Sequence, residues 1–276
     1  MIWLHCALIY EPVKAHGILA ICTYYYRVSF ILDEQIGAVL RLTLNRPEKK
    51  NAITQDMYQR LADKINEAAG NFSIRAVVIN SNGDSFTAGN DINDFANDPQ
   101  MDEGSPVFNF LFAIHNFPKP LIASVKGRAV GIGTTMLLHC DLVTANPDTQ
   151  FSMPFVSLGL VAEGGSSYLF PRLVGHAKAS EILLTGRTFS ADEAKEMGLI
   201  NSIAADELAA AMVFANEIAE QPPNAVINTK ALLKSGSHEA LNQVIKAEGV
   251  LFKMAAESDE AQLAFMNFLS KKSKVN

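Results

Sequence analysis

Residues 121–145 read LIASVKGRAVGIGTTMLLHCDLVTA, and this stretch decides the expected fold. Two apolar runs, at 121–125 and 141–145, have the length and composition of buried strands. Between them a glycine-rich segment opens an apolar stretch that predicts a helix from about Gly133. A strand, a helix and a second strand in this order are typical of a βαβ unit, so we expect an α/β fold with mainly parallel strands and helices packed on them.

The segments before this stretch continue the alternation. The runs IGAVLRLTL at 36–44 and RAVVIN at 75–80 predict strands, and residues 81–91 predict a loop. Between the two strands, apolar residues recur every three to four positions over 54–70, with Thr54 as N-cap. This pattern predicts an amphipathic helix.

After Ser166 the pattern becomes helical throughout. Ser190 and Glu193 have the spacing of a capping box, and Gly198 can end the short helix that they begin. From Asp206 to the end we expect three or four amphipathic helices and no strand.

Residues 1–28 are rich in apolar side chains but lack the pattern of a targeting segment. Glu11, Pro12 and Lys14 interrupt the apolar runs before a membrane-spanning length is reached. There is no basic n-region and no small-residue cleavage pattern. We therefore expect an N-terminal extension at 1–28, or the product of an upstream start codon, then a core at 29–205 and a helical region at 206–276.

The composition excludes several classes of protein. With 49% hydrophobic and 19% charged residues in 276, the chain is expected to fold, and its net charge of -6 gives no footprint for nucleic acid. Three scattered cysteines and the lack of an HExxH pattern predict neither a disulfide framework nor a metal site. We expect no metal and no separate cofactor, no membrane partner and a reducing, cytoplasmic setting.

Two glycine-containing segments are candidates for ligand binding. The loop SFTAGNDINDF at 85–95 follows a predicted strand and has small residues where backbone could approach a ligand, although a plain turn capped by Asn90 and Asp91 explains it equally well. The segment 127–141 lacks the third glycine of a dinucleotide fingerprint and the lysine of a P-loop. What remains is a helix N-terminus whose free N–H groups suit negative charge.

Two charged features allow a structural and a functional interpretation. Glu163 lies in the mostly apolar run 153–173 before two glycines, where it can be a charge at a helix N-terminus or, in an apolar pocket, a general base with a raised pKa. The loop RPEKKNA at 46–52 is a local cluster of positive charge in an acidic protein, and it can be a solvated turn or an anion contact.

Taken in order, these segments resemble the crotonase superfamily of acyl-CoA enzymes from about residue 29 to 273. LNRPEKKNAI is similar to that family's first CoA-contacting segment, AGNDI to its first oxyanion-hole loop, and KPLIASVKGRAVGIG to the second. The resemblance implies a spiral of ββα units, followed by a C-terminal helical region that forms trimers or dimers of trimers.

Three positions point to one branch of this superfamily. A typical enoyl-CoA hydratase uses two glutamates, and by resemblance these positions hold Thr135 and Phe155 here. Neither side chain can take up a proton at neutral pH. The run PFVSLGLVAEGGSSYLFPRL instead resembles Δ3,Δ2-enoyl-CoA isomerases, whose single catalytic carboxylate would be Glu163.

The resemblance also implies the remaining site residues. The backbone N–H groups of Asn90 and Ile132 would form the oxyanion hole, and Thr135 and Phe155 would line the acyl pocket. The expected contacts of an acyl-CoA substrate are Arg46, Lys49, Lys50, Ala52, Ala88, Gly89, Asp91, Ile92 and Gly131. Which lysine meets the CoA phosphates stays open.

Alternatives remain within and beyond this family. Another reaction of the same superfamily, such as hydration, ring-opening isomerisation or thioester hydrolysis, would use the same scaffold, and a non-catalytic acyl-CoA-binding protein would keep the pocket alone. The end KSKVN lacks the tripeptide that addresses a peroxisome, which favours a cytoplasmic setting.

Overall fold

The computed structural model describes residues 29–92, 94 and 102–273, so the N-terminal extension and the end of the 85–95 loop lie outside the described residues. One sheet of the described part has the strand order β1 (Ile31–Ile36), β2 (Val39–Leu44), β3 (Ala76–Ser81), β4 (Leu121–Val125), β6 (Leu142–Ala145) and β9 (Ser202–Ile203). The β1–β2 pair is antiparallel and all later neighbours are parallel. The expected mainly parallel sheet is confirmed.

The strand predicted at 36–44 is confirmed at Val39–Leu44 as β2, but it is the second strand of a β1–β2 hairpin whose first strand was not predicted. Gly37 has a φ of 59°, which lets the backbone turn tightly between the two strands. Only Ile31 of β1 is buried. An edge strand with one buried side chain carries almost no apolar pattern, so sequence analysis missed it.

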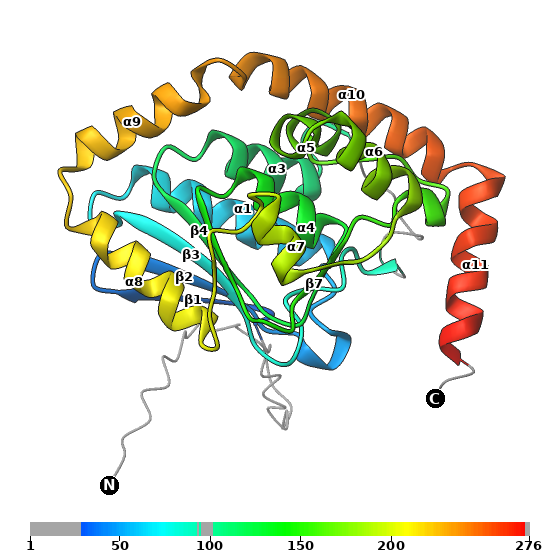
Figure 1. Ribbon diagram of the computed structural model, residues 1–276, viewed down its shortest axis with the longest axis horizontal. Helices are drawn as coiled ribbons and strands as arrows, with labels where there is room; N and C mark the ends of the chain where they lie inside the picture. Colours follow the sequence, from blue (N-terminus) through cyan, green and yellow to red (C-terminus); the bar gives the residue numbers. More distant parts are fainter. Residues whose placement is uncertain (1–28, 93, 95–101, 274–276) are drawn as a thin grey trace, which may run out of the picture.

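Helices cover both faces of this sheet. Figure 1 shows α1 (Gln55–Gly70) and α3 (Pro106–Asn116) on one side and α8 (Glu207–Ala219) on the other. Strand β3 is therefore buried along its whole length, with Val77 in the core on the α1/α3 side and Val78 packed in the cluster that includes α8. The predicted helix at 54–70 is confirmed, and the Thr54 side chain accepts a hydrogen bond from the Met57 N–H.

A second, smaller sheet carries the segments that form the site. It consists of β5 (Arg128–Val130), β7 (Gln150–Ser152) and β8 (Phe189–Ser190). The helix predicted from Gly133 begins at Ile132 and is short, because α4 (Ile132–Thr135) passes directly into the 3-10 turn η2 (Met136–His139).

The expectation of helix throughout after Ser166 is wrong at β8 and β9, since two-residue strands leave no periodic signal in a sequence. The remaining elements of the core are short. They are η1 (Pro47–Lys49), η3 (Val156–Leu158), α5 (Ser166–Val174), α6 (His176–Thr185) and α7 (Ala191–Glu196). The capping box predicted from Ser190 and Glu193 is present at the start of α7.

Three further helices follow α8. In Figure 1, α9 (Pro223–Ser235) and α10 (His238–Ala256) run as an arc over the core, and α11 (Asp259–Ser273) turns down beside it. Along α10, Leu241, Ile245 and Phe252 are buried, whereas Val250, Leu251 and Met254 are exposed. These exposed apolar side chains form a surface that a second subunit could cover. Trimerisation itself stays a prediction.

The close packing of α10 on α3 can be tested at Gly249. A Cβ atom there would lie 2.1 Å from Cζ of Phe108, so Gly249→Ala must displace the buried Phe108 ring or move the two helices apart. Although alanine favours helix formation, we expect a net loss of about 1–3 kcal/mol, seen as a fall in the midpoint of thermal unfolding. Gly236→Ala is the control, because a Cβ there meets nothing within 4 Å. Equal stability of both variants would contradict the packing.

Candidate active site

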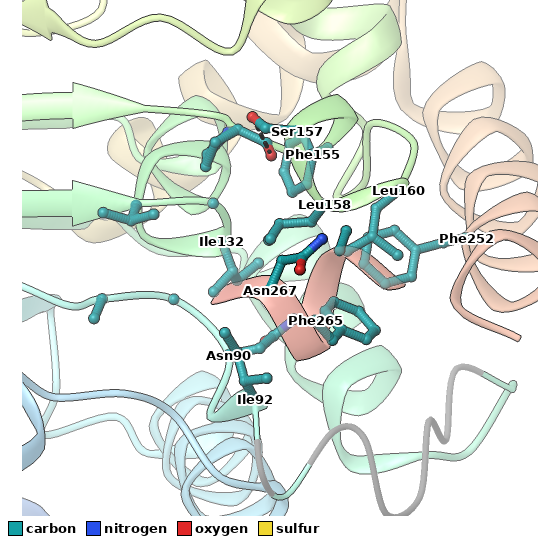
Figure 2. Close-up of a pocket in the computed structure, with 16 residues that line it drawn as sticks. Asn90, Ile92, Ile132, Phe155, Ser157, Leu158, Leu160, Phe252, Phe265 and Asn267 are labelled. Atoms are coloured by element: carbon teal, nitrogen blue, oxygen red, sulfur yellow. Dashed lines mark hydrogen bonds between the residues drawn. The ribbon is translucent and has the colours of Figure 1, made fainter. Parts of the chain in front are cut away.

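A cavity of about 520 Å³ lies where the two sheets and the C-terminal helices meet. Its walls are formed by the loop after β3, the β5–α4 turn, the segment around η3, and helices α10 and α11. Figure 2 shows the lining side chains, which are Ala88, Gly89, Asn90, Ile92, Val130, Gly131, Ile132, Pro154, Phe155, Ser157, Leu158, Leu160, Phe252, Ala264, Phe265 and Asn267. No acidic or basic side chain is among these described residues, so the cavity is suited to an apolar ligand.

Asn90 and Ile132, whose backbone N–H groups are the predicted oxyanion-hole donors, both line the cavity and come from different loops. Ile132 is the first residue of α4, where helix geometry leaves the N–H without an intrahelical partner. Within the described part of the chain, neither its N–H nor that of Asn90 donates a backbone hydrogen bond. Two such donors can stabilise an oxygen atom that gains negative charge.

Close contacts between the two loops fix the positions of these donors. At Gly89, with φ of 88°, a Cβ would lie 2.9 Å from the Val130 carbonyl oxygen, and at Gly133 a Cβ would lie 2.4 Å from Cγ2 of Thr87. The Gly89 carbonyl also accepts a 2.8 Å hydrogen bond from the Ile53 N–H. Gly89 therefore allows one backbone to approach another, and Gly133 makes room for the Thr87 side chain.

Glu163 is buried, with 3% of its surface exposed, and precedes α5. Its Oε1 accepts a 2.6 Å hydrogen bond from the Thr135 hydroxyl. Burial raises the pKa of Glu163 to about 8; the Thr135 hydrogen bond opposes this rise and the negative charge of Glu248 adds to it. The carboxylate that binds the N–H groups at the start of α5 belongs to Glu248, so Glu163 does not play the helix-terminal role left open by the sequence.

Glu163 and Thr135 are enclosed beside the cavity and are not among its lining residues. Glu163 interacts electrostatically with Tyr58, whose pKa is raised by burial and by the charge of Glu163. The Tyr58 hydroxyl donates a hydrogen bond to Oδ1 of Asn90, which does line the cavity.

The structure brings Arg46, Ala52 and Asp91 together. The guanidinium of Arg46 donates to the Asp91 carboxylate at 2.6 Å and to the Ala52 carbonyl at 3.0 Å, and both charged side chains are largely buried. This ion pair joins the 46–52 loop to the loop that contains Asn90. Arg46 is thereby neutralised, which makes it less suited to a phosphate than its charge alone suggested.

Lys49 and Lys50 lie on the exposed side of the same loop. The Lys50 backbone carbonyl accepts a 2.9 Å hydrogen bond from the Ala88 N–H, so this loop is tied directly to the cavity rim. Of the other predicted residues, Gly89, Ile92, Gly131 and Phe155 line the cavity. Phe155 packs against Phe252 in a T-shaped contact with 6.3 Å between ring centroids.

Sequence analysis missed several residues of this region. Phe252 and Phe265 complete the cavity wall, but at helical spacing they look like ordinary core residues. Tyr58 and Glu248 lie on helices far from Glu163 in sequence, and no local pattern predicts their contacts.

No group of three or more His, Cys, Asp or Glu residues suited to a metal ion occurs in the described ranges. Among the helices that the structure describes, none has the length and apolar character needed to cross a bilayer.

An apolar cavity lined by Asn90 and Ile132, with a buried carboxylate beside it, is an arrangement suited to chemistry at a polarised carbonyl group. Residues 34–275 match the family described as enoyl-CoA hydratase/isomerase, and the chain belongs to this family of the crotonase superfamily. The fold agrees: the structure of Pseudomonas aeruginosa OdaA superposes with a TM-score of 0.85 at 43% identity, covering 87% of this chain and 98% of that one.

Two similar proteins are named for different isomerase reactions. Human enoyl-CoA delta isomerase 2 is 36% identical over 246 residues, which cover 86% of this chain but 62% of the human protein, so this chain matches less than two thirds of its length. The 1,2-epoxyphenylacetyl-CoA isomerase of Escherichia coli is 32% identical over 255 residues, covering 89% of this chain and 97% of that protein.

The raised pKa of Glu163 predicts a pH-dependent effect on stability. Between the ordinary carboxyl pKa of 4.5 and the folded-state value of about 8, the unfolded chain is ionised while the folded one is still protonated, so stability falls as pH rises. Glu163→Gln removes this loss. We expect the gain in unfolding temperature of the variant over wild type to grow from pH 5 to pH 8.

Glu193→Gln is the matched control: Arg187 lowers the pKa of that carboxyl, so its effect on stability is gained below pH 5, and the variant should lose unfolding temperature by an amount that changes little from pH 5 to pH 8. Differential scanning calorimetry in a pH series measures both. A pH-independent difference between Glu163→Gln and wild type would contradict the raised pKa.

Proposed function

We propose that this protein is a Δ3,Δ2-enoyl-CoA isomerase that converts 3-enoyl-CoA thioesters to trans-2-enoyl-CoA in fatty acid β-oxidation. The observation that carries the proposal is the buried carboxylate of Glu163, with a pKa raised to about 8, beside a cavity whose described lining contains no acid. The similarity to human enoyl-CoA delta isomerase 2 supports the same reaction.

The first step removes a proton from C2 of the acyl chain. This proton is acidic only if the thioester oxygen can take up negative charge as the C2–H bond breaks. The N–H groups of Asn90 and Ile132 would donate to that oxygen, and in other enzymes the loss of one such donor costs about 3 kcal/mol. The contacts that hold the two loops together thus serve the reaction directly.

Glu163 would accept the C2 proton and return it to C4. Electrons from the C2–H bond form the dienolate, and protonation at C4 leaves the double bond between C2 and C3, conjugated with the thioester. A carboxyl with a pKa near neutrality can both accept and donate this proton. One carboxylate is sufficient, and neither water nor a metal ion enters the reaction.

The composition of the wall disfavours addition of water. Phe155 stands where the resemblance places a hydratase glutamate, and it packs on Phe252 instead of holding a solvent molecule. Thr135 stands at the other such position, and its hydroxyl group donates a hydrogen bond to Glu163. The nearby Glu248 carboxylate is engaged by the Gly165 N–H and by the Ser167 N–H and hydroxyl, so it is not placed to activate water.

The CoA moiety would extend from the cavity along the 46–52 loop. Lys49 and Lys50 are exposed there and could meet its phosphates, whereas Ala88 and Ile92 would contact the pantetheine chain. A CoA thioester places its apolar chain and its anionic end in the environments that this surface provides.

A second candidate is ring-opening isomerisation of an epoxyacyl-CoA. The similarity over 97% of the Escherichia coli 1,2-epoxyphenylacetyl-CoA isomerase favours it, and the same donors and base would serve. Activity on a 3-enoyl-CoA with none on an epoxyacyl-CoA separates the two.

An absorbance assay with 3-hexenoyl-CoA tests the isomerase reaction. We expect wild type to form the conjugated 2-enoyl thioester and Glu163→Gln to reduce kcat by about 100- to 10,000-fold, because the variant lacks the base. Glu207→Gln, which changes another buried carboxylate far from the cavity, serves as the control.

Product analysis in heavy water accompanies this assay. Isomerisation predicts a product without added water, and any deuterium would reside at the carbon that is reprotonated. A 3-hydroxyacyl product, no turnover by wild type, or full activity of Glu163→Gln would each contradict the proposal.

A further inference from the structure

The peptide unit that joins Gly164 to Gly165 directly follows Glu163. Both glycines have positive φ, 66° and 76°, so the chain turns sharply here before α5 begins. A Cβ at Gly165 would lie 2.4 Å from Cδ1 of Leu241 on α10. The turn is therefore pressed against the C-terminal helices, and its orientation determines where the Glu163 side chain begins.

Both polar groups of this peptide unit are bound by buried side chains. The Gly164 carbonyl accepts a hydrogen bond from Nε2 of His139 at 2.7 Å, and the Gly165 N–H donates to Oε2 of Glu248 at 2.6 Å. Burial lowers the pKa of His139 to about 3, so its ring is neutral. Because a carbonyl oxygen only accepts, the proton of that ring must be on Nε2.

Glu248 holds more than one peptide group. Its Oε1 accepts from the Ser167 N–H at 2.9 Å and from the Ser167 hydroxyl at 2.5 Å. The same helix contributes Phe252 to the cavity wall. Helix α10 thus links the turn after Glu163, the first turn of α5 and the acyl-binding surface.

We propose that His139 and Glu248 are positioning residues, which clamp the Gly164–Gly165 peptide from its two sides and so fix the Glu163 carboxylate for proton transfer. This inference rests on the proposed function, in which Glu163 is the base. A general base must lie within hydrogen-bond reach of the proton that it removes, so small displacements of its backbone lower kcat strongly.

The clamp also acts on Glu163 through charge. The groups that face its carboxylate are the Thr135 hydroxyl from α4, the Tyr58 phenol from α1 and the Glu248 carboxylate from α10. Glu248 raises the pKa of Glu163 and Thr135 lowers it. Removing one or the other should move the pH dependence of the reaction in opposite directions.

Kinetics of three variants test the clamp in the full-length protein. For Glu248→Gln and His139→Leu we expect kcat for 3-hexenoyl-CoA to fall about 10- to 100-fold with KM little changed. His139→Gln keeps an N–H donor and should recover most of this loss. Glu239→Gln, an exposed carboxylate in the first turn of α10, should behave as wild type.

The pH profile and backbone exchange separate positioning from a purely structural role. The acid limb of kcat should move to lower pH in Glu248→Gln and to higher pH in Thr135→Val. Hydrogen–deuterium exchange of a peptide covering 163–168 should be faster in Glu248→Gln, because the Gly165 and Ser167 N–H groups lose acceptors.

Two results would overturn the inference while leaving the proposed function intact. One is wild-type kcat in both Glu248→Gln and His139→Leu while Glu163→Gln is inactive. The other is a loss of kcat that follows a smaller folded fraction, with the acid limb unmoved and His139→Gln no better than His139→Leu. Full activity of Glu163→Gln would instead reject the function, and the positioning role with it.

Discussion

Burying one carboxylate without an opposite charge is the constraint on which this site depends. Water stabilises an ionised Glu by several kcal/mol, and burial of Glu163 removes that stabilisation. The structure offers the side chain a hydroxyl from Thr135 but no cation among the contacts described. Burial therefore raises the pKa of Glu163 toward neutrality and at the same time lowers the stability of the fold. Contacts from the surrounding elements must offset this loss.

The elements that do so come from distant parts of the chain. The 46–52 loop is tied to the Asn90 loop by the Arg46–Asp91 ion pair, and that loop is pressed on the β5–α4 turn through Gly89 and Gly133. From the opposite side, α10 binds the backbone after Glu163. Asn90, Ile132 and Glu163 thus lie on separate segments of the chain, which come together only in the folded protein.

Much of this arrangement follows from the sequence, and the reasons for the exceptions are physical. Long buried strands and the capped helix at 54–70 have strong periodic patterns, and Glu163 stands out as an acid in an apolar run. Strand β1 and the two-residue strands have no such pattern. Arg46 carries the charge expected of a phosphate contact, but its partner Asp91 is 45 positions away, and only the fold shows that they pair.

The wall formed by α11 has an evolutionary consequence. Ala264, Phe265 and Asn267 close one side of the cavity, yet they lie on the last described helix, apart from the loops that carry the N–H donors and from the turn after Glu163. Substitutions on this helix would deepen or shorten the pocket without altering the residues to which the proposed chemistry is assigned. Under the proposed function, selectivity for acyl length would be separable from catalysis, and one scaffold of this kind would diversify among substrates by varying a single terminal helix.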